Sequence, residues 1–261
     1  MSFSIAVAGK GGTGKTTLST LVVRHLIENK LVPILAIDAD PNANFGESLG
    51  LDVTDTVGST IAGFNEDKIS LPSGMTKEAY LEFKLNGTLA ESRGVDLLTM
   101  GRGQGAECYC YPNMVLRKFA DSLVQNYRYM VMDNEAGMEH LSRKTTDNID
   151  VLMLVSNHSV KGVRAVARIR ELVAEVKLVI GQQLVVVTSV PGSLDPVISE
   201  EMNRLGIEPA ALIPYDETIQ KFDFERRTLL DLPDDSAAVT AVYGLMSGIL
   251  SKESVLKGAK K

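Results

Sequence analysis

The sequence predicts an α/β fold in which a doubly wound, mostly parallel sheet is covered by helices on both faces. Two observations support this fold class. Short apolar runs alternate along the chain with amphipathic stretches, which is the order expected of β-α-β units. In addition, the pattern G-x-x-x-x-G-K-T at residues 9–16 stands between the first apolar run and the first amphipathic stretch. A phosphate-binding loop joins strand to helix in that position.

The strands expected in this sheet are short, near-continuous apolar runs, as parallel strands covered on both faces require. In chain order they are residues 5–8, 33–37, 97–100, 129–132, 151–155, 184–188 and 210–213. The helices between them have apolar residues at helical spacing. They are residues 16–29, 112–125, 160–176, 196–205 and 237–250. Ligands of such a sheet bind beyond the carboxyl ends of its strands.

The predicted domain organisation is simple. We find no linker, internal repeat or low-complexity tract, and we expect residues 1–261 to form a single domain. Residues 52–94 are rich in Gly, Ser, Thr and charged residues and follow no clear period. We therefore expect an irregular insertion there, packed over the nucleotide or partner face.

Composition and charge narrow the function classes. Of the 261 residues, 44% are hydrophobic and 23% charged, as in ordinary globular domains. The net charge of −6 disfavours nucleic acid and anionic membranes as partners. We see no apolar run near the ~20 residues that a transmembrane helix needs, and the first strand begins too early for a signal peptide. Two cysteines are too few for a secreted disulfide framework, so we expect a cytoplasmic protein.

Residues 9–17, with the sequence GKGGTGKTT, carry the chemistry of a phosphate-binding loop. Glycines allow backbone N–H groups to wrap phosphate oxygens, and the N-terminus of the following helix adds partial positive charge. We expect Lys15 to contact the β- and γ-phosphates and the Thr16 hydroxyl to bind Mg²⁺. A glycine-rich turn without a ligand is the alternative, but the order of strand, loop and helix favours a nucleotide site. The expected nucleotide contacts are Gly11, Gly12, Thr13, Gly14, Lys15, Thr16 and Thr17.

Two apolar strands beside this loop end in carboxylates. Residues 33–37 lead into Asp38 and Asp40, and residues 129–132 lead into Asp133. A carboxylate at the end of such a strand is placed to bind Mg²⁺ directly or through water. Capping of a turn is the alternative role of this residue type. We assign Asp38 and Asp133 to the nucleotide and its cation, and Asp40, as a catalytic residue, to the attacking water.

Lys10 follows the first glycine, where ordinary phosphate loops do not require a lysine. This form of the loop resembles the deviant Walker A loop of the MinD/ParA/nitrogenase-iron-protein ATPases, and the resemblance extends to the segments at Asp38 and Asp133. It implies a MinD-like (SIMIBI-class) P-loop NTPase that binds ATP, ADP and Mg²⁺. It also implies an ATP-sandwiched homodimer in which Lys10 reaches the phosphates of the other subunit and acts in catalysis together with Lys15.

The same resemblance extends to the base-binding side. Residues 213–216, Ile-Pro-Tyr-Asp, are similar to the family's adenine-side loop, which makes Pro214 and Asp216 expected nucleotide contacts. Many relatives carry an Asn after the preceding strand, whereas this chain has Thr-Ser-Val at residues 188–190. The resemblance therefore leaves the adenine contacts open.

Cys108 and Cys110 are the only cysteines of the chain and lie between a predicted strand and a predicted helix. In an extended backbone, residues i and i+2 point to the same side, so both sulfurs can face one soft metal ion. Two thiolates leave a four-coordinate site incomplete, and a two-fold axis beside the pair would supply two more. The alternative is a pair of small buried hydrophobic side chains.

Three segments narrow the resemblance to one branch. Residues 100–110, with the pattern M-G-x-G…C-Y-C, and residues 133–143 and 213–217 resemble the CooC-type ATPases. These are nickel-insertion factors of carbon monoxide dehydrogenase, with close relatives that serve acetyl-CoA synthase. The resemblance implies that Cys108 and Cys110 of two subunits bind one Ni²⁺, or Zn²⁺ in its place, at the dimer interface. It implies a metallochaperone that delivers nickel to one of these enzymes.

Two other functions remain open from the sequence. The cysteines of a dimer could hold an iron–sulfur cluster, although a C-x-C pair without further cysteines fits a single ion better. Alternatively, the chain could be a metal-independent positioning ATPase of the MinD or ParA kind, with residues 242–256 as an amphipathic membrane helix. We prefer a packing helix there, because its apolar positions suit burial and the acidic chain lacks a broad basic face.

Overall fold

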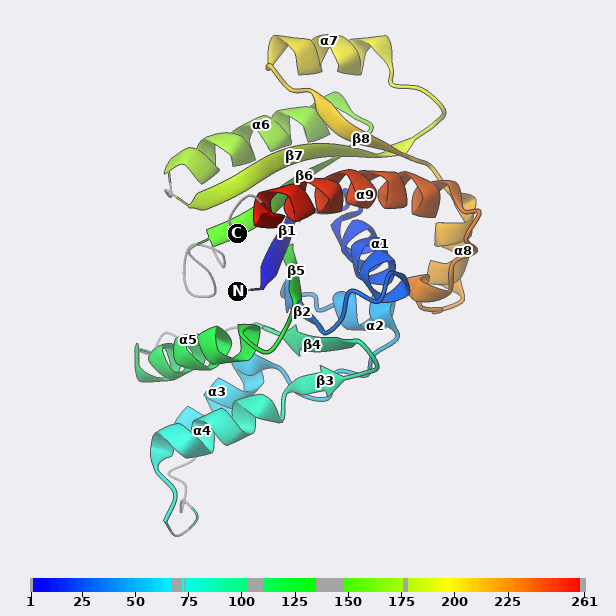
Figure 1. Cartoon of the computed structure of the whole chain (residues 1–261). Helices are drawn as coiled ribbons and strands as arrows, with labels where there is room; N and C mark the ends of the chain where they lie inside the picture. The colour runs from blue at the N-terminus through cyan, green and yellow to red at the C-terminus, as the bar shows by residue number, and fades with distance from the viewer. Residues whose placement is uncertain are drawn as a thin grey trace.

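The computed structural model describes residues 2–66, 72, 74–102, 110–134, 148–175 and 178–258 and shows an eight-stranded sheet between two layers of helices (Figure 1). The strand order is β3-β4-β2-β5-β1-β6-β7-β8, and all neighbouring pairs are parallel except β3 with β4. On one side of β1 the chain continues outward through β6, β7 and β8, and on the other side lie β2, β3 and β4, with β5 inserted between β2 and β1. Strands on both sides of the first strand make this a doubly wound topology. The predicted α/β fold class is confirmed.

The elements have the following bounds. The strands are β1 (Phe3–Gly9), β2 (Ile34–Ala39), β3 (Leu89–Glu91), β4 (Val95–Thr99), β5 (Tyr129–Asn134), β6 (Asn148–Asn157), β7 (Val179–Val190) and β8 (Pro209–Pro214). The helices are α1 (Lys15–Glu28), α2 (Phe45–Leu49), α3 (Val57–Glu66), α4 (Lys77–Asn86), α5 (Cys110–Val124), α6 (Val160–Glu175), α7 (Pro196–Arg204), α8 (Glu217–Phe224), the short 3₁₀ helix η2 (Leu229–Asp231) and α9 (Ala237–Gly258). Each element expected from the sequence is present, although β6, β7 and α9 are longer than expected.

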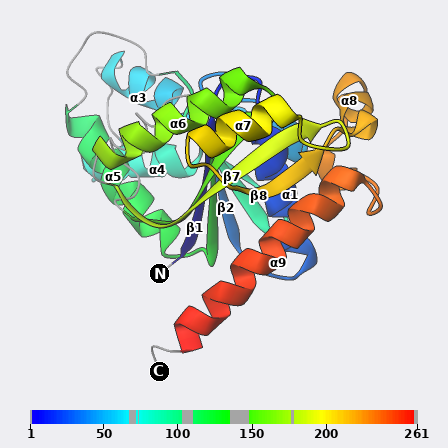
Figure 2. The same ribbon diagram turned by 90° about the horizontal axis from the view of Figure 1, so that it is seen from above.

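The central strands build two cores, because alternate side chains of a strand point to opposite faces of the sheet. On β1, Ile5 and Val7 pack with α1, α2, α8 and α9, whereas Ala6 and Ala8 pack on the side of α3 to α7 (Figure 2). All six residues of β2 and of β5 are buried. Burial on both faces explains why these strands are continuous apolar runs in the sequence.

Residues 52–94 contain regular structure that the sequence pattern did not indicate. The segment forms α3 and α4, and β3 adds an antiparallel edge strand beside β4. α4 begins after Thr76, whose hydroxyl accepts a hydrogen bond from the N–H of Ala79 at 3.1 Å, and it buries Leu81 and Leu85. Both helices have ten residues, too few for a helical period to stand out. We therefore expected an irregular segment where short helices form.

α9 packs its apolar residues against the sheet. Val239, Val242, Met246 and Ile249 are at most 4% exposed and belong to the same core as β1 and α1. These are the positions that a membrane-bound helix would need to turn outward. Over the part of the chain that the structure describes, no helix is both long and apolar enough to cross a bilayer. Burial of α9 agrees with the packing helix that we preferred.

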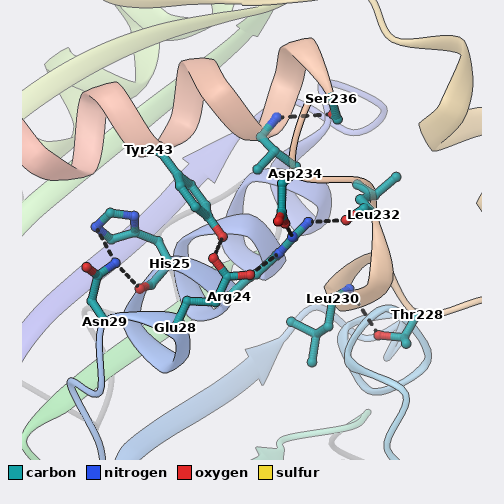
Figure 3. A network of polar contacts seen from close by, with 11 residues as sticks. Arg24, His25, Glu28, Asn29, Thr228, Leu230, Leu232, Asp234, Ser236 and Tyr243 are labelled. Carbon is teal, nitrogen blue, oxygen red and sulfur yellow. Dashed lines mark hydrogen bonds and ion pairs between the residues drawn. The ribbon is translucent and has the colours of Figure 1, made fainter.

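A polar network holds α1, the helix that follows the phosphate loop, to the start of α9 (Figure 3). The Arg24 side chain is 5% exposed and donates to Glu28 Oε1 at 2.7 Å and to the Leu232 carbonyl at 2.6 Å. It also forms an ion pair with Asp234, whose side chain is 93% exposed. From α9, the hydroxyl of Tyr243 donates to the other carboxylate oxygen of Glu28. The network fixes the position of α1 relative to the last third of the chain.

We expect Arg24→Ala to lower the free energy of unfolding by about 2 kcal/mol, because it removes buried packing and leaves a carbonyl without its charged donor. The acidic partners are partly or fully solvated, so the cost stays below that of breaking a wholly buried ion pair. Asp234→Asn is the matched control and is expected to cost less than about 0.5 kcal/mol, as for exposed ion pairs. Urea unfolding measures both values. Equal costs for the two variants would show that the exposed ion pair, not the buried guanidinium, holds the helices together.

Candidate nucleotide-binding site

The loop between β1 and α1 has the shape of a phosphate cradle. Gly12 and Gly14 have φ of 74° and 80°, left-handed conformations that favour glycine. Thr13 closes the loop, since its N–H and its hydroxyl both donate to the carbonyl of Lys10, at 3.3 and 2.7 Å. Gly14 is the N-cap of α1, and because it has no side chain, it cannot offer a side-chain acceptor to the first N–H groups of the helix. The first N–H groups of α1 are therefore available to an anion.

Lys15 lies inside this cradle. The residue is 6% exposed, and its Nζ donates to the Lys10 carbonyl at 3.5 Å, the outer limit of a hydrogen bond. A buried ammonium with so weak a partner attracts an anion. The hydroxyl of Thr188 donates to the Thr13 carbonyl at 2.7 Å and so fixes the loop to the end of β7. The geometry suits the phosphate contacts expected for residues 11–17.

Asp38 and Asp133 are side by side at the carboxyl ends of β2 and β5, where they are register partners. They are 0% and 1% exposed. The Thr16 hydroxyl donates to Asp133 Oδ2 at 2.6 Å, and the Ser19 hydroxyl donates to Asp133 Oδ1 at 3.3 Å. Two carboxylates and the hydroxyl of the phosphate loop thus converge at one end of the sheet.

The electrostatics of these carboxylates favour a bound cation. Burial raises the pKa of Asp133 to about 7, and the neighbouring Asp38 adds to the effect, against the hydrogen bond from Thr16 and the charge of Lys15. Burial likewise raises the pKa of Asp38 to about 6. Hydroxyl and carboxylate oxygens are the hard ligands that Mg²⁺ prefers. The donor set of Thr16 and Asp133 therefore fits Mg²⁺.

Asp38 and Asp40 shape the turn after β2. Asp38 Oδ1 accepts the N–H of Asp40 at 3.0 Å, and Asp38 Oδ2 accepts the N–H of Phe45, the first residue of α2, at 2.9 Å. Asp40 Oδ1 accepts hydrogen bonds from the backbone and side-chain nitrogens of Asn42, each at 2.9 Å. Both carboxylates thus act within the turn, and Asp40 lies at its more accessible end.

A largely apolar cavity adjoins the phosphate loop on the side of β7 and β8. Its walls include Leu18 of α1, Ile213 of β8 and Ile219 of α8, and the predicted Pro214 and Asp216 also line it. Asp216 is the N-cap of α8. Its Oδ1 accepts the N–H of Thr218 at 2.9 Å, and its Oδ2 accepts the hydroxyl of Ser236 at 2.6 Å. The carboxylate therefore joins α8 to the segment before α9, in addition to bordering the cavity.

The predicted metal ligands fall outside what the structure describes. Cys108 lies in the undescribed segment, and Cys110 is described only as the first backbone position of α5. Among the described residues, no group of three or more His, Cys, Asp or Glu side chains forms a metal site. The nickel site therefore stays a prediction.

The sequence analysis did not predict two polar side chains of the site, those of Ser19 and Thr188. Ser19 lies one turn after Thr16 on α1 and donates to the same carboxylate. Because residues i and i+3 lie on the same face of a helix, the sequence could have indicated that Ser19 shares the partner of Thr16. Thr188 was noted only as a departure from the Asn of relatives, yet its hydroxyl holds the phosphate loop. That hydrogen bond joins the end of β7 to the loop after β1, which are far apart in the sequence, so no local sequence pattern predicts it.

The cradle after β1, the buried Lys15 and the hydroxyl–carboxylate pair of Thr16 and Asp133 together define a P-loop nucleotide-binding protein. The chain belongs to the CobQ/CobB/MinD/ParA nucleotide-binding domain family, whose model matches residues 4–229.

Similar proteins fall into two groups. By sequence, the chain is 36% identical over 95% of its length to an ATP-binding protein of Methanocaldococcus jannaschii, covering 99% of that protein. It is 26% identical over 97% of its length to the carbon monoxide dehydrogenase accessory protein CooC of Rhodospirillum rubrum, covering 98% of it. By structure, it is similar to the MinD cell division protein of Aquifex aeolicus, with a TM-score of 0.68, 20% identity and coverage of 96% and 97% of the two chains. The MinD protein of Pyrococcus horikoshii bound to Mg-ADP gives a TM-score of 0.67 at 20% identity, with coverage of 94% of each chain. The structural matches confirm the MinD/ParA-like fold.

Proposed function

We propose that this protein is an ATP-hydrolysing metallochaperone. In this proposal Cys108 and Cys110 of two subunits bind one nickel ion at a homodimer interface that ATP controls, and the metal passes to carbon monoxide dehydrogenase or acetyl-CoA synthase. The observation that carries the proposal is the contact of Met100 with Asp38. Met100 directly follows β4, and its N–H donates to the Asp38 carbonyl at 2.8 Å; in the sequence, the chain continues from Met100 toward Cys108. The likeness to the CooC protein along nearly the whole chain supports the same function.

The nucleotide steps use residues that the fold brings to one end of the sheet. The phosphates would lie on the loop and the N-terminus of α1, with Lys15 at the β- and γ-phosphates. Thr16 and Asp133 would hold Mg²⁺, which neutralises phosphate charge when bound. Asp40 orients the attacking water, and Lys10 from the second subunit neutralises charge across the interface, as an arginine finger does. The cavity beside β7 and β8 holds the base.

Asp38 links the nucleotide to the cysteine segment. Its side chain holds the N–H groups of Asp40 and Phe45, and its carbonyl holds Met100. Any change at Asp38 between ATP- and ADP-bound states is therefore passed both to the turn after β2 and to the residues that lead to Cys108. ATP needs to favour the closed dimer by only a few kcal/mol to change metal occupancy strongly.

The proposal predicts a defined metal stoichiometry. In an anaerobic titration with Ni²⁺ and ATP, the wild type is expected to bind about one ion per two chains, because four thiolates complete one site. Cys108→Ser is expected to lose this binding, with an affinity at least about 100-fold lower, since a hydroxyl is a poor ligand for a soft ion. Equilibrium titration and size measurement follow the metal and the dimer together.

A matched control is Met114→Ser, which removes an exposed sulfur from α5, four positions after Cys110 in the sequence, and should leave nickel binding unchanged. Nickel bound equally well by Cys108→Ser would exclude the metal site. An absorption band of an iron–sulfur cluster in anaerobically purified protein would replace the nickel proposal by the cluster-carrying alternative. ATP-dependent sedimentation with liposomes, without any metal bound, would favour the positioning ATPase instead.

A further inference from the structure

We infer that Thr99 is a positioning residue of the nucleotide site: its hydroxyl becomes the donor to the Asp38 carboxylate when the site binds nucleotide and Mg²⁺. The inference rests on the proposed ATPase function and adds a group to its cation site. The first observation is a buried hydroxyl without a partner. Thr99, the last residue of β4, is 1% exposed, and its hydroxyl makes no hydrogen bond among the residues that the structure describes. An unpaired buried hydroxyl costs free energy, and most such groups in proteins are paired.

The sheet places this hydroxyl beside Asp38. In the parallel register of β4, β2 and β5, Thr99, Asp38 and Asp133 are partners in one row. Side chains of one row point to the same face of a sheet, and neighbouring strands are about 4.8 Å apart. The Asp38 carboxylate is therefore the acceptor next to the Thr99 hydroxyl in this row, and it is also next to Asp133, the proposed Mg²⁺ ligand.

The start of α2 covers this row. Asp38 Oδ2 accepts the N–H of Phe45, the first residue of α2. A Cβ at Gly46 would lie 3.3 Å from Leu97 Cδ2, so α2 also packs on β4. Leu97 points to the same face as Thr99, because it lies two positions earlier on the same strand. The Thr99 hydroxyl is thus enclosed by the site, where it can serve Asp38 and is shielded from bulk water.

The donors that Asp38 uses come from a strained turn. They are the N–H groups of Asp40 at 3.0 Å and of Phe45 at 2.9 Å, at the two ends of the turn after β2. Within that turn Ala43 has a φ of 53°, a left-handed conformation that is unfavourable for a residue with a Cβ. Because one strained turn supplies both donors, a shift of that turn removes them from Asp38.

Thr99 is the donor that remains beside the carboxylate after such a shift. A carboxylate has lone pairs for about four hydrogen bonds, so Asp38 can accept the hydroxyl in addition to its other bonds or in place of them. The hydrogen bond would pair the buried hydroxyl and fix Asp38 relative to β4. The strained turn and the unpaired hydroxyl therefore point to the same second arrangement of Asp38.

The test measures Mn²⁺, in place of Mg²⁺, bound to the full-length protein in excess over ADP, from the paramagnetic resonance signal of free Mn²⁺. Thr99→Val keeps the shape of the side chain and removes the hydroxyl. It is expected to weaken Mn²⁺ binding by about tenfold or more, the low end for loss of a hydrogen bond to a charged group. Without metal and nucleotide, the urea midpoint of this variant should equal or exceed that of the wild type, because no hydrogen bond is lost. Thr99→Ser keeps a hydroxyl and should bind Mn²⁺ within about threefold of the wild type.

The matched control is Thr88→Val, the same substitution at a buried threonine between α4 and β3. Thr88 is 4% exposed, and its hydroxyl donates to the Leu85 carbonyl at 2.7 Å. Loss of this paired hydroxyl should lower the urea midpoint and leave Mn²⁺ binding unchanged.

The outcomes separate this inference from the proposed function. A wild type that binds neither ADP nor Mn²⁺ overturns both. A wild type that binds both, with unchanged Mn²⁺ affinity in Thr99→Val, overturns the role of Thr99 alone. So does a urea midpoint that falls in Thr99→Val as it does in Thr88→Val, because the hydroxyl would then be bonded within the metal-free fold. Equal losses of Mn²⁺ affinity in Thr99→Val and Thr99→Ser also overturn it, since packing and not the hydroxyl would be the cause. A loss confined to Thr99→Val supports the inference.

Discussion

Lys10→Ala is expected to lower ATP hydrolysis by about 1,000-fold, which is the low end of the range for a positive charge supplied across an interface. Each isolated subunit of the variant should still bind ATP. The structure gives two reasons. The main chain of Lys10 belongs to the loop, since its carbonyl accepts from Thr13 and Lys15. The residue itself is exposed, and no hydrogen bond or ion pair to its ammonium occurs among the residues described. The ammonium is therefore available to a second subunit.

A mixing experiment decides whether Lys10 acts on the other subunit. Lys10→Ala and Asp40→Ala proteins, each inactive alone, are combined in equal amounts and their phosphate release is measured. If Lys10 acts across the interface, each mixed dimer has one complete site, because the Lys10→Ala subunit keeps Asp40 and receives Lys10 from its partner. About a quarter of the wild-type rate should return, since half of random dimers are mixed and half of their sites are complete. A mixture as inactive as its components would mean that Lys10 acts within its own subunit.

The phosphate loop could be predicted almost completely from the sequence, because its residues are consecutive and the strand and helix around it carry strong local patterns. Asp38 and Asp133 were also predictable, since each ends an apolar run and parallel strands end at one edge of a sheet. Their direct pairing in register depends on β5 lying between β1 and β2, which follows from strand order. The sequence therefore identified both carboxylates as site residues, but it did not show that they are buried next to each other.

Other parts of the fold and site depend on contacts that sequence patterns do not carry. β7 begins with alternating exposure over Val179–Gln183, so only its buried second half was an apolar run. Asp216 was expected at the nucleotide, yet its strongest contacts are with Thr218 and Ser236. The Ser236 contact spans 20 positions and requires α9 to return beside α8. Such long-range polar contacts are set by packing, not by local propensity.

Asp133→Asn is expected to reduce Mg²⁺-dependent ATP hydrolysis by about 100-fold or more and, at the same time, to stabilise the nucleotide-free protein. The first effect follows from the loss of a carboxylate at the proposed Mg²⁺ site. The second follows from its surroundings. Asp133 is 1% exposed, stands beside Asp38, and receives hydroxyl donors from Thr16 and Ser19. An amide of the same shape keeps an acceptor for Thr16 but carries no charge that must be buried beside Asp38.

The pH dependence of stability gives the sign of this effect. The pKa of Asp133 rises from 3.8 to about 7 on folding, first because of burial. The folded protein therefore binds the proton more tightly than the unfolded chain, and the free energy of unfolding falls as the pH rises from about 4 to about 7. Above about pH 7 the Asn variant should be more stable than the wild type by about 2 kcal/mol. This difference in the free energy of unfolding is about half of what the full pKa shift would give. Below pH 4 the difference should vanish.

Urea unfolding of metal-free and nucleotide-free protein at several pH values measures the difference, and phosphate release measures the activity. The matched control is Asp150→Asn, the same substitution at an exposed site on β6, where the carboxylate accepts hydrogen bonds from Ser4 at 2.8 and 2.9 Å. It should leave hydrolysis within about twofold of the wild type, since it touches no group that binds phosphate or cation. A variant Asp133→Asn that is less stable than the wild type at every pH would mean that the carboxylate is compensated within the folded chain. In that case a bound cation would not be required to compensate the charge of the two buried carboxylates at the end of the sheet.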